Sequence, residues 1–274
     1  MARPKLTDSA RPATFEVEAY NERGEMVPTS IAGEHPLTLY LDKREIVTLM
    51  TLGHAPEALV IGYLRNQRVV DSIDDIAAVQ VDWETDSAAV TTLKQKDIDL
   101  SKKTVTSGCG QGTMFGNLME EIETIDLRKD VFLEDTNLFL LIEKVRKHET
   151  IYKQAGAVHG CALATTAGEI LMFVEDVGRH NAVDAIAGFM WLDGIDGSDK
   201  VFYTTGRLTS EMVIKCAQMR IPFLVSRSGL TQMGHSIAQK VGITMLGRAS
   251  GRHYLAFTGK ERLVRSAPQP TAVA

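Results

Sequence analysis

The feature that most constrains the fold is a regular alternation of helix-like and strand-like segments in the second half of the chain. Apolar residues recur every three or four positions in some stretches and form short continuous runs in others. The expected order is helix 138–145, strands 158–164 and 169–175, helix 183–190, strand 201–204, helix 212–219, strand 223–226, helix 233–241, and strands 243–246 and 253–257. This alternation predicts an α/β fold in which helices cover both faces of a sheet with parallel strand pairs, a three-layer α/β/α arrangement.

The first half has a different pattern, which predicts a smaller mixed α+β unit. Residues 14–20 alternate between apolar and polar types, as expected for a half-buried strand. Hairpins are expected at 37–50 and 76–93, with a helix at 55–65 between them. A chain of 274 residues is long enough for about two domains. We therefore expect a domain at residues 1–129 and a second at residues 130–274.

The composition limits the partners and the compartment. The net charge is −5 and the pI is near 5.8, which argues against a broad nucleic-acid-binding surface because such surfaces need a basic excess. The apolar runs are far shorter than the ~20 residues of a membrane span, and the N-terminus lacks the apolar stretch of a secretory signal. Three widely spaced cysteines indicate a reducing compartment rather than a disulfide framework. We expect a cytoplasmic protein that binds neither nucleic acid nor membranes.

Three predicted strand-to-helix junctions share a pattern that suits phosphate groups. The junctions are residues 176–181, 205–207 and 226–229, and each holds a glycine and an arginine. Loops that follow parallel strands lie at one edge of a sheet, where helix N-termini and guanidinium groups bind anions. A single loop arginine is usually only solvated, but three at equivalent junctions favour a site for a dinucleotide-like ligand. The candidate residues are Arg179, His180, Asn181, Gly206, Arg207, Ser226 and Arg227.

Cys109 is the strongest candidate for covalent chemistry. It lies in residues 106–113, TSGCGQGT, whose small and permissive residues predict a flexible loop without an apolar pocket. An exposed thiolate on such a loop can accept a sulfane sulfur and pass it on. The pair Cys109 and His180 would also suit a Cys–His hydrolase, and this alternative stays open on the residues alone.

No metal site is expected. His159 and Cys161 stand where a zinc deaminase would place His-x-Glu, but the glutamate and the second motif, Pro-Cys-x-x-Cys, are missing. Zinc needs three or four protein ligands. We interpret Cys161 and Cys216 as small residues of the core.

Taken together, these segments resemble the formate dehydrogenase accessory sulfurtransferase family, FdhD. The similar segments are 34–37, 59–64, 175–184, 205–207, 210–213, 221–222, 226–228, 242–247 and 251–252. The resemblance covers about residues 30–258, and the motifs of the second half are the most specific.

The resemblance implies a fold, an activity and a ligand. Members take sulfur from a cysteine desulfurase as a persulfide on a loop cysteine, matched here by Cys109. They pass it to the molybdenum bis(molybdopterin guanine dinucleotide) cofactor of formate dehydrogenase. The resemblance also implies a homodimer and a C-terminal domain similar to a cytidine deaminase without zinc. The family's cofactor-binding segment matches Leu246, Gly247, Arg248, Ala249, Ser250 and Gly251.

The chain departs from the family pattern at one position. The family loop is commonly Cys-x-x-Cys, whereas Gly112 stands at the second cysteine position here. Thiol exchange within the loop is therefore excluded, although Cys109 alone can still carry one persulfide sulfur. The alternative function is a chaperone that binds the cofactor without transferring sulfur.

Overall fold

The computed structural model describes residues 3–94, 122, 124–148 and 150–266, with the backbone of 104–105 and 112–113. Cys109 and the other residues of its predicted loop at 106–111 lie outside these ranges. Among the described residues the chain forms a five-stranded sheet, a six-stranded sheet and several short ribbons, with helices packed between and beside the sheets.

The six-stranded sheet is built by the second half of the chain. Its spatial order is β12-β11-β13-β14-β15-β16. The strands β13, β14 and β15 are mutually parallel, whereas β11 is antiparallel to both of its neighbours. The strand bounds are β11 His159–Thr165, β12 Ile170–Asp176, β13 Lys200–Thr204, β14 Phe223–Ser226, β15 Thr244–Ser250 and β16 His253–Thr258.

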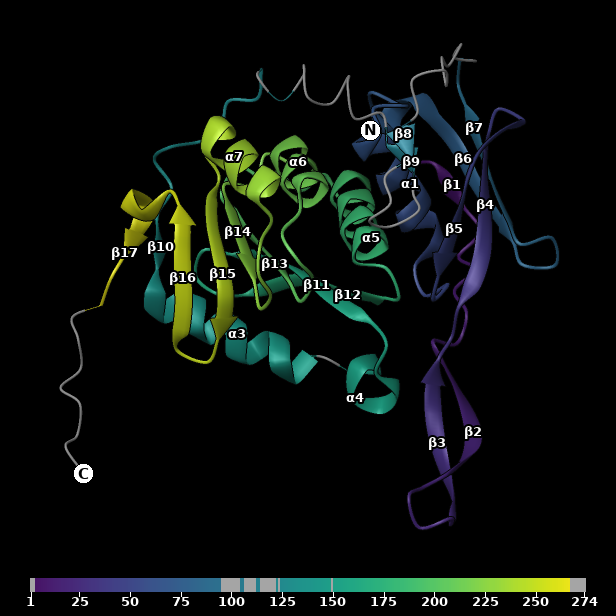
Figure 1. Cartoon of the computed structure of the whole chain (residues 1–274). Coiled ribbons are helices and arrows are strands. Elements are labelled where there is room, and N and C mark those ends of the chain that lie inside the picture. The colour runs from purple at the N-terminus through teal and green to yellow at the C-terminus, as the bar shows by residue number, and fades with distance from the viewer. Residues whose placement is uncertain are drawn as a thin grey trace.

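Helices cover both faces of this sheet, so its central strands are buried on two sides (Figure 1). On one face lie α5 (Arg179–Leu192), α6 (Ser210–Gln218) and α7 (Gln232–Val241), and on the other lies α3 (Asp135–His148). Alternate side chains of each strand enter one of two apolar clusters: Phe202 packs with α5 and α6, whereas Tyr203 packs with α3. The predicted α/β class and the predicted three layers are therefore both seen in the structure.

The five-stranded sheet is built by the first half of the chain, in the order β1-β6-β7-β4-β5. Both predicted hairpins are present as antiparallel pairs, β4 with β5 and β6 with β7. The bounds are β1 Lys5–Leu6, β4 His35–Leu41, β5 Arg44–Thr51, α1 Pro56–Asn66, η1 Ile73–Asp75, β6 Ile76–Asp82 and β7 Ser87–Thr92. Short ribbons elsewhere pair β8 Thr104–Val105 with β9 Gly112–Thr113 and β10 Leu133–Glu134 with β17 Leu263–Val264, which follows η2 Lys260–Arg262.

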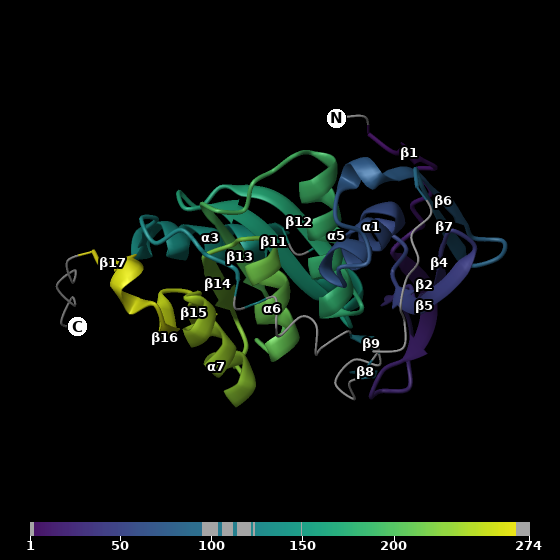
Figure 2. The same cartoon turned by 90° about the horizontal axis from the view of Figure 1, so that it is seen from above.

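The two halves meet where α1 lies against α5 (Figure 2). Glycines allow the two helix backbones to touch: a Cβ atom on Gly62 would lie 1.6 Å from the Asp184 carbonyl oxygen. A Cβ atom on Gly188 would lie 1.9 Å from the Ala58 carbonyl oxygen. One apolar cluster runs through this contact and contains residues of both sheets. The domain division at residue 129 stays a prediction, but the two ranges share a core.

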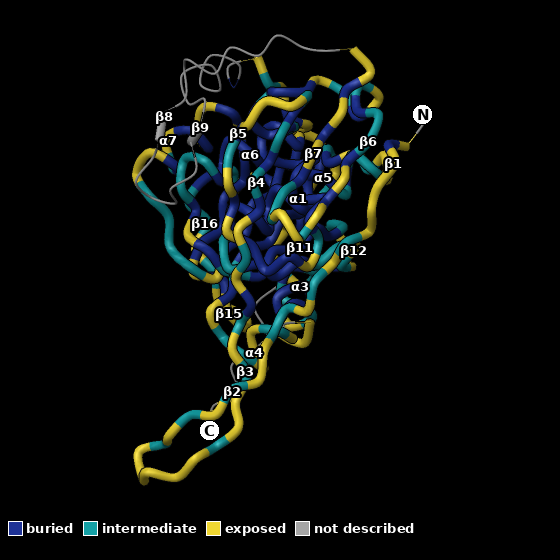
Figure 3. Tube along the Cα trace, turned by 90° about the vertical axis from the view of Figure 1, so that its right-hand side faces the viewer, coloured by how far each residue is buried: buried dark blue, intermediate teal, exposed yellow. Residues whose placement is uncertain are grey.

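A hairpin of β2 (Thr14–Tyr20) and β3 (Met26–Ala32) projects from the body (Figure 3). The strand at 14–20 was correctly predicted, and its alternation is seen in the partial burial of Val17 and Ala19 beside the exposed Glu18 and Tyr20. Phe15 and Ile31 are cross-strand partners and are both exposed. Near its base the hairpin contacts the short helix α4 (Ile151–Ala155), where Gln154 Nε2 donates to Ser30 Oγ at 3.4 Å.

Candidate functional site

The topology brings the three predicted junctions to one edge of the six-stranded sheet. Because β12, β13 and β14 run in the same direction, their carboxyl ends share that edge, where the antiparallel β11 begins. The register pairs His159 with Asp176 and Thr204 with Ser226. We call Arg179, Arg207 and Arg227, together with His159 between them, the arginine rim.

The charges of the rim converge on His159. This imidazole is half-buried at the start of β11. Burial lowers its pKa below the ordinary value, and the nearby cations Arg179, Arg207 and Arg227 lower it further. All three arginines therefore lie within electrostatic range of one ring, which makes this edge a place where an anion is favoured.

The three arginines differ in how they are held. Arg179 opens α5 and is almost fully buried, and its Nε has no hydrogen-bond partner among the described residues. Its side chain crosses Gly206, where an added Cβ would lie 2.7 Å from Arg179 Cδ. Arg207 and Arg227 are exposed, and the Arg227 guanidinium lies 5.5 Å from the ring centre of Tyr152 in α4. The rim thus offers one preorganised cation and two that can reach toward solvent.

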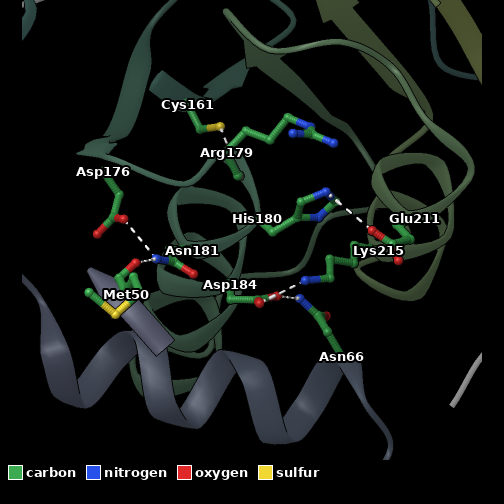
Figure 4. A network of polar contacts seen from close by, with 10 residues as sticks. All are labelled: Met50, Asn66, Cys161, Asp176, Arg179, His180, Asn181, Asp184, Glu211 and Lys215. Carbon is green, nitrogen blue, oxygen red and sulfur yellow. Dashed lines mark hydrogen bonds and ion pairs between the residues drawn. The ribbon is translucent and has the colours of Figure 1, made fainter. Parts of the chain in front are cut away.

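A buried carboxylate fixes the first junction to the N-terminal sheet (Figure 4). Asn181 Nδ2 donates to Asp176 Oδ1 at 2.8 Å and to the Met50 carbonyl oxygen at 2.6 Å. Thr51 Oγ1 donates to Asp176 Oδ2 at 2.6 Å. Burial raises the pKa of Asp176, and these donors counteract the rise. Asn181 is therefore buried and holds α5 in place, and direct cofactor contact by this residue stays a prediction.

His180 also faces the interior. Its Nε2 lies 3.2 Å from Glu211 Oε2, and its side chain is 3% exposed. Burial, followed by the cations Lys215 and Arg179, lowers the pKa of His180 to about 2. The imidazole is thus neutral and enclosed between α5 and α6, so it is poorly placed to serve as the base of a Cys–His hydrolase.

A buried ion pair lies directly below His180 (Figure 4). Lys215 Nζ of α6 donates to Asp184 Oδ2 at 2.7 Å, and Asn66 Nδ2 of α1 donates to Asp184 Oδ1 at the same distance. Burial raises the pKa of Asp184, whereas Lys215 lowers it. This triad joins α1, α5 and α6 below the rim.

A cavity of about 880 Å³ adjoins the rim on the face covered by α3. Its wall includes Arg227 together with Phe139, Glu143 and Arg146 of α3. The volume is within the usual range of small-molecule sites. Arg227 thus belongs both to the rim and to the cavity, which makes one continuous region for a ligand with an apolar or aromatic part and an anionic part.

The predicted segment 246–251 runs along β15 past the end of β14. Arg248 adopts φ 53°, and its backbone N–H donates to the Ser228 carbonyl oxygen at 2.8 Å, so the segment is tied to the third junction. Ala249, Ser250 and Gly251 line the cavity. Leu246, Gly247 and Ala249 are buried, whereas Arg248, Ser250 and Gly251 are exposed.

Gly206 and Ser226 shape the middle of the rim. Both are buried, and Ser226 Oγ donates to the Gly206 carbonyl oxygen at 2.6 Å. The same hydroxyl accepts from the Ser228 backbone N–H at 2.9 Å. These contacts fix the second and third junctions relative to each other.

The two cysteines of the core are buried and unreactive. Cys161 and Cys216 are both fully buried and free of disulfides. Burial raises the pKa of the Cys161 thiol to about 12 and that of Cys216 well above its usual value. The prediction that they belong to the core is confirmed, and Cys109 lies outside the described residues.

Sequence reasoning missed several residues around the site. The α3 wall of the cavity carries no recognisable motif, and α4 is only five residues long. Glu175 belongs to the 175–184 segment, and its carboxylate accepts from the backbone N–H groups of Ile151 and Tyr152, each at 3.0 Å. A glutamate next to Asp176 could have signalled a helix-capping role, but its partner helix was not predicted.

The described part of the chain holds neither a metal-binding cluster nor a membrane-spanning helix. No group of three or more His, Cys, Asp or Glu residues there is arranged to hold a metal ion. No helix there is both long enough and apolar enough to cross a membrane.

Fold and rim define an α/β protein with an arginine-lined sheet edge, and the comparisons give its family. Residues 32–264 match the model of the FdhD/NarQ family. The chain belongs to the FdhD/NarQ family.

Relatives and a solved structure agree with this assignment. The sulfur carrier protein FdhD of Listeria monocytogenes is 30% identical over 254 residues, covering 91% of this chain and 95% of the relative. The protein of the same name from Bacillus subtilis is 28% identical over 250 residues, covering 88% and 94%. The crystal structure of a formate dehydrogenase accessory protein from Desulfotalea psychrophila matches with a TM-score of 0.75 and 25% identity, covering 92% of this chain and all of that one.

Proposed function

We propose that this protein is a sulfur carrier that accepts sulfur on Cys109 and delivers it to a molybdenum bis(molybdopterin guanine dinucleotide) cofactor bound at the arginine rim. The observation that carries the proposal is that the junctions holding Arg179, Arg207 and Arg227 lie at one edge of the six-stranded sheet, beside a cavity of about 880 Å³. The names of the relatives supply the sulfur-carrier role and the link to formate dehydrogenase.

The loading step is a thiol–persulfide exchange. The Cys109 thiolate attacks the outer sulfur of a cysteine desulfurase persulfide, a new S–S bond forms, and the desulfurase cysteine leaves as a thiolate. Delivery breaks the S–S bond of the Cys109 persulfide and releases the terminal sulfur as sulfide. This reduction needs two electrons, which the reduced molybdenum centre of the substrate supplies. One cysteine is sufficient for both steps, so Gly112 at the second position is compatible with transfer.

The chain's own residues would bind and orient the substrate. The guanidinium groups of Arg207 and Arg227 suit the phosphate oxygens, because each presents a planar fork of donors. The cavity beside Arg227 suits a nucleoside arm, because its wall combines the aromatic ring of Phe139 with the polar ends of Glu143 and Arg146. The buried side chains of Asn181 and His180 would act by fixing α5 rather than by touching the substrate.

The persulfide is the first test. The protein is incubated with a cysteine desulfurase and cysteine, and the mass of the Cys109 peptide is measured without reductant. We expect one added sulfur on Cys109 and none on Cys216, which serves as the internal control. A Cys109→Ala strain should then lack active formate dehydrogenase, whereas a Cys216→Ala strain should retain it.

The cofactor chaperone without sulfur transfer is the second candidate, and Gly112 is the observation that favours it. The same strains separate the two functions. A chaperone would tolerate Cys109→Ala with formate dehydrogenase still active, and no sulfur would be found on Cys109.

The rim is tested separately from the thiol. Replacing Arg207 or Arg227 with alanine removes a charge-assisted contact that contributes about 1.5–3 kcal/mol. We expect guanine nucleotide affinity, measured by calorimetry, to fall roughly 10-fold to 100-fold. Arg23→Ala, at the exposed tip of the projecting hairpin, is the matched control and should bind normally. Unchanged affinity in both rim variants would refute the rim as the binding site.

The donor and recipient follow from the same proposal. We infer a cysteine desulfurase as the source of sulfur and formate dehydrogenase as the recipient of the cofactor. The homodimeric state and the cytoplasmic location stay predictions of the resemblance.

A further inference from the structure

His159 occupies the centre of the rim, and one side of its ring is tied to the protein. Its Nδ1 lies 3.4 Å from Thr205 Oγ1, and the same hydroxyl accepts from the Gly160 backbone N–H at 3.1 Å. The Thr205 backbone N–H in turn donates to the Gly160 carbonyl oxygen at 2.9 Å. The hydroxyl is therefore held in place beside Nδ1 by the β11–β13 pairing.

The Thr205 hydroxyl can serve two protonation states of the ring. A hydroxyl has one proton and two lone pairs, and its proton rotates to suit its neighbours. It can donate to Nδ1 of a neutral imidazole, and it can accept from Nδ1–H of an imidazolium. In the neutral tautomer whose Nδ1 accepts from Thr205, and also in the imidazolium, Nε2 carries a proton that is not donated to any described residue.

The charged groups around His159 come from every neighbouring element. Arg179 and the neutral His180 lie on α5, and Arg207 and Arg227 follow β13 and β14. Asp176 is the cross-strand partner on β12, but its oxygens are engaged by Thr51, Asn181 and the backbone N–H groups of Leu52 and Gly178. Three cations therefore oppose a fourth positive charge on the ring while the rim holds no anion.

We propose that His159 is a fourth ligand-binding residue of the rim, and that it takes up one proton when a dianionic group binds there. The proton comes from solvent and is added at Nδ1, while Nε2–H donates to an oxygen of the anion. No covalent bond is made, and release of the anion returns the proton to solvent. The inference rests on the proposed function, because it assigns His159 a role at the same rim.

The electrostatic reason is that a bound dianion neutralises part of the positive charge that the arginines place around His159. A dianion offsets two of the three guanidinium charges, so the cost of protonating His159 falls when the site is filled. The pKa of His159 lies below its ordinary value in the empty protein, and we expect it to rise on binding. By linkage, affinity for the dianion should increase as the pH falls toward the pKa of the empty site, by up to about tenfold per pH unit for one proton.

Sulfate is the probe, because it resembles a phosphate group and its own charge does not change over the working pH range. The histidines are labelled with ¹³C at Cε1, and each is titrated by NMR in saturating sodium sulfate and in sodium chloride of equal ionic strength. The chloride series controls for screening of the arginines. We expect the His159 pKa to rise in sulfate but not in chloride.

His159→Gln supplies the matched variant, since its amide keeps a donor but cannot titrate. We expect it to bind sulfate like the unmodified protein at high pH and to lose the increase in affinity at low pH. If this variant fails to fold, the resonance of His159 is assigned by elimination from the other single histidine variants. The NMR titration of His159 in sulfate and in chloride is then the test of the inference.

The outcomes separate this inference from the proposed function. One set of results would refute only the inference: sulfate binds, the Arg207→Ala variant binds sulfate more weakly, and the His159 pKa does not change. In that case the arginine rim would still be the binding site. If sulfate causes no change at His159 and no shift at the backbone amides of 205–207 and 226–229, both the rim and the inference are overturned.

Discussion

Gly188→Ala offers the sharpest test of how the two halves are joined. The added methyl carbon would lie 1.9 Å from the Ala58 carbonyl oxygen, and its contact is with backbone rather than with a movable side chain. Ordinary contact is reached at about 3.5 Å. The helices α1 and α5 would therefore have to separate by about 1.5 Å along much of their crossing.

The expected cost follows from this displacement. Overpacking of a close-packed core usually costs about 1–3 kcal/mol. A clash with the backbone of the facing helix should cost an amount at the upper end of this range. Alanine in a helix interior recovers about 1 kcal/mol relative to glycine. We therefore expect the free energy of unfolding to fall by about 2 kcal/mol.

Urea unfolding followed by circular dichroism measures this loss. The matched control is Gly229→Ala, where no atom lies within 4 Å of the added Cβ and φ is not positive; its unfolding free energy should change by less than about 0.5 kcal/mol. Unfolding of Gly188→Ala at the same urea concentration as the unmodified protein would refute the close helix contact.

Three further predictions concern the site and its support. Lys215→Met leaves the fully buried Asp184 without its cation, which should cost about 3–5 kcal/mol near neutral pH. Because burial raises the pKa of Asp184, protonation favours the folded state, so urea unfolding should show the loss shrinking as the pH falls through that raised pKa. Gly206→Ala places a Cβ 2.7 Å from Arg179 Cδ. We expect guanine nucleotide affinity to fall by about tenfold in calorimetry, since one cation is displaced, and the free energy of unfolding to fall by about 1–3 kcal/mol because the site is overpacked. Iodoacetamide should label neither Cys161 nor Cys216 in the folded protein, because both thiols are buried and their pKa values are raised. Mass spectrometry should find both labelled after unfolding. Labelling of Cys161 in the folded protein would contradict the enclosed core.

The second half of the fold could be predicted because its strands are short buried runs between amphipathic helices. That pattern fixes strand direction, and direction alone places the ends of β12, β13 and β14 at one edge. The convergence of Arg179, Arg207 and Arg227 was therefore available from the sequence.

Other parts of the site depend on contacts between distant segments. Nothing local in the sequence reveals that Asn181 bonds to Met50 or that Lys215 neutralises Asp184. A polar residue in a motif can equally face a ligand or the interior, and His180 faces the interior. The hairpin partner β3 was missed because Pro28 interrupts its pattern.

The helix contact at Gly62 and Gly188 has a consequence for protein engineering. A chimaera that joins the first half of one relative to the second half of another would keep this contact only if both helices had no side-chain atoms where they cross. Since Met50 and Thr51 of the first half hold Asn181 and Asp176 at the first junction, we expect such a chimaera to inherit its ligand preference from both parents rather than from the half that carries the arginines.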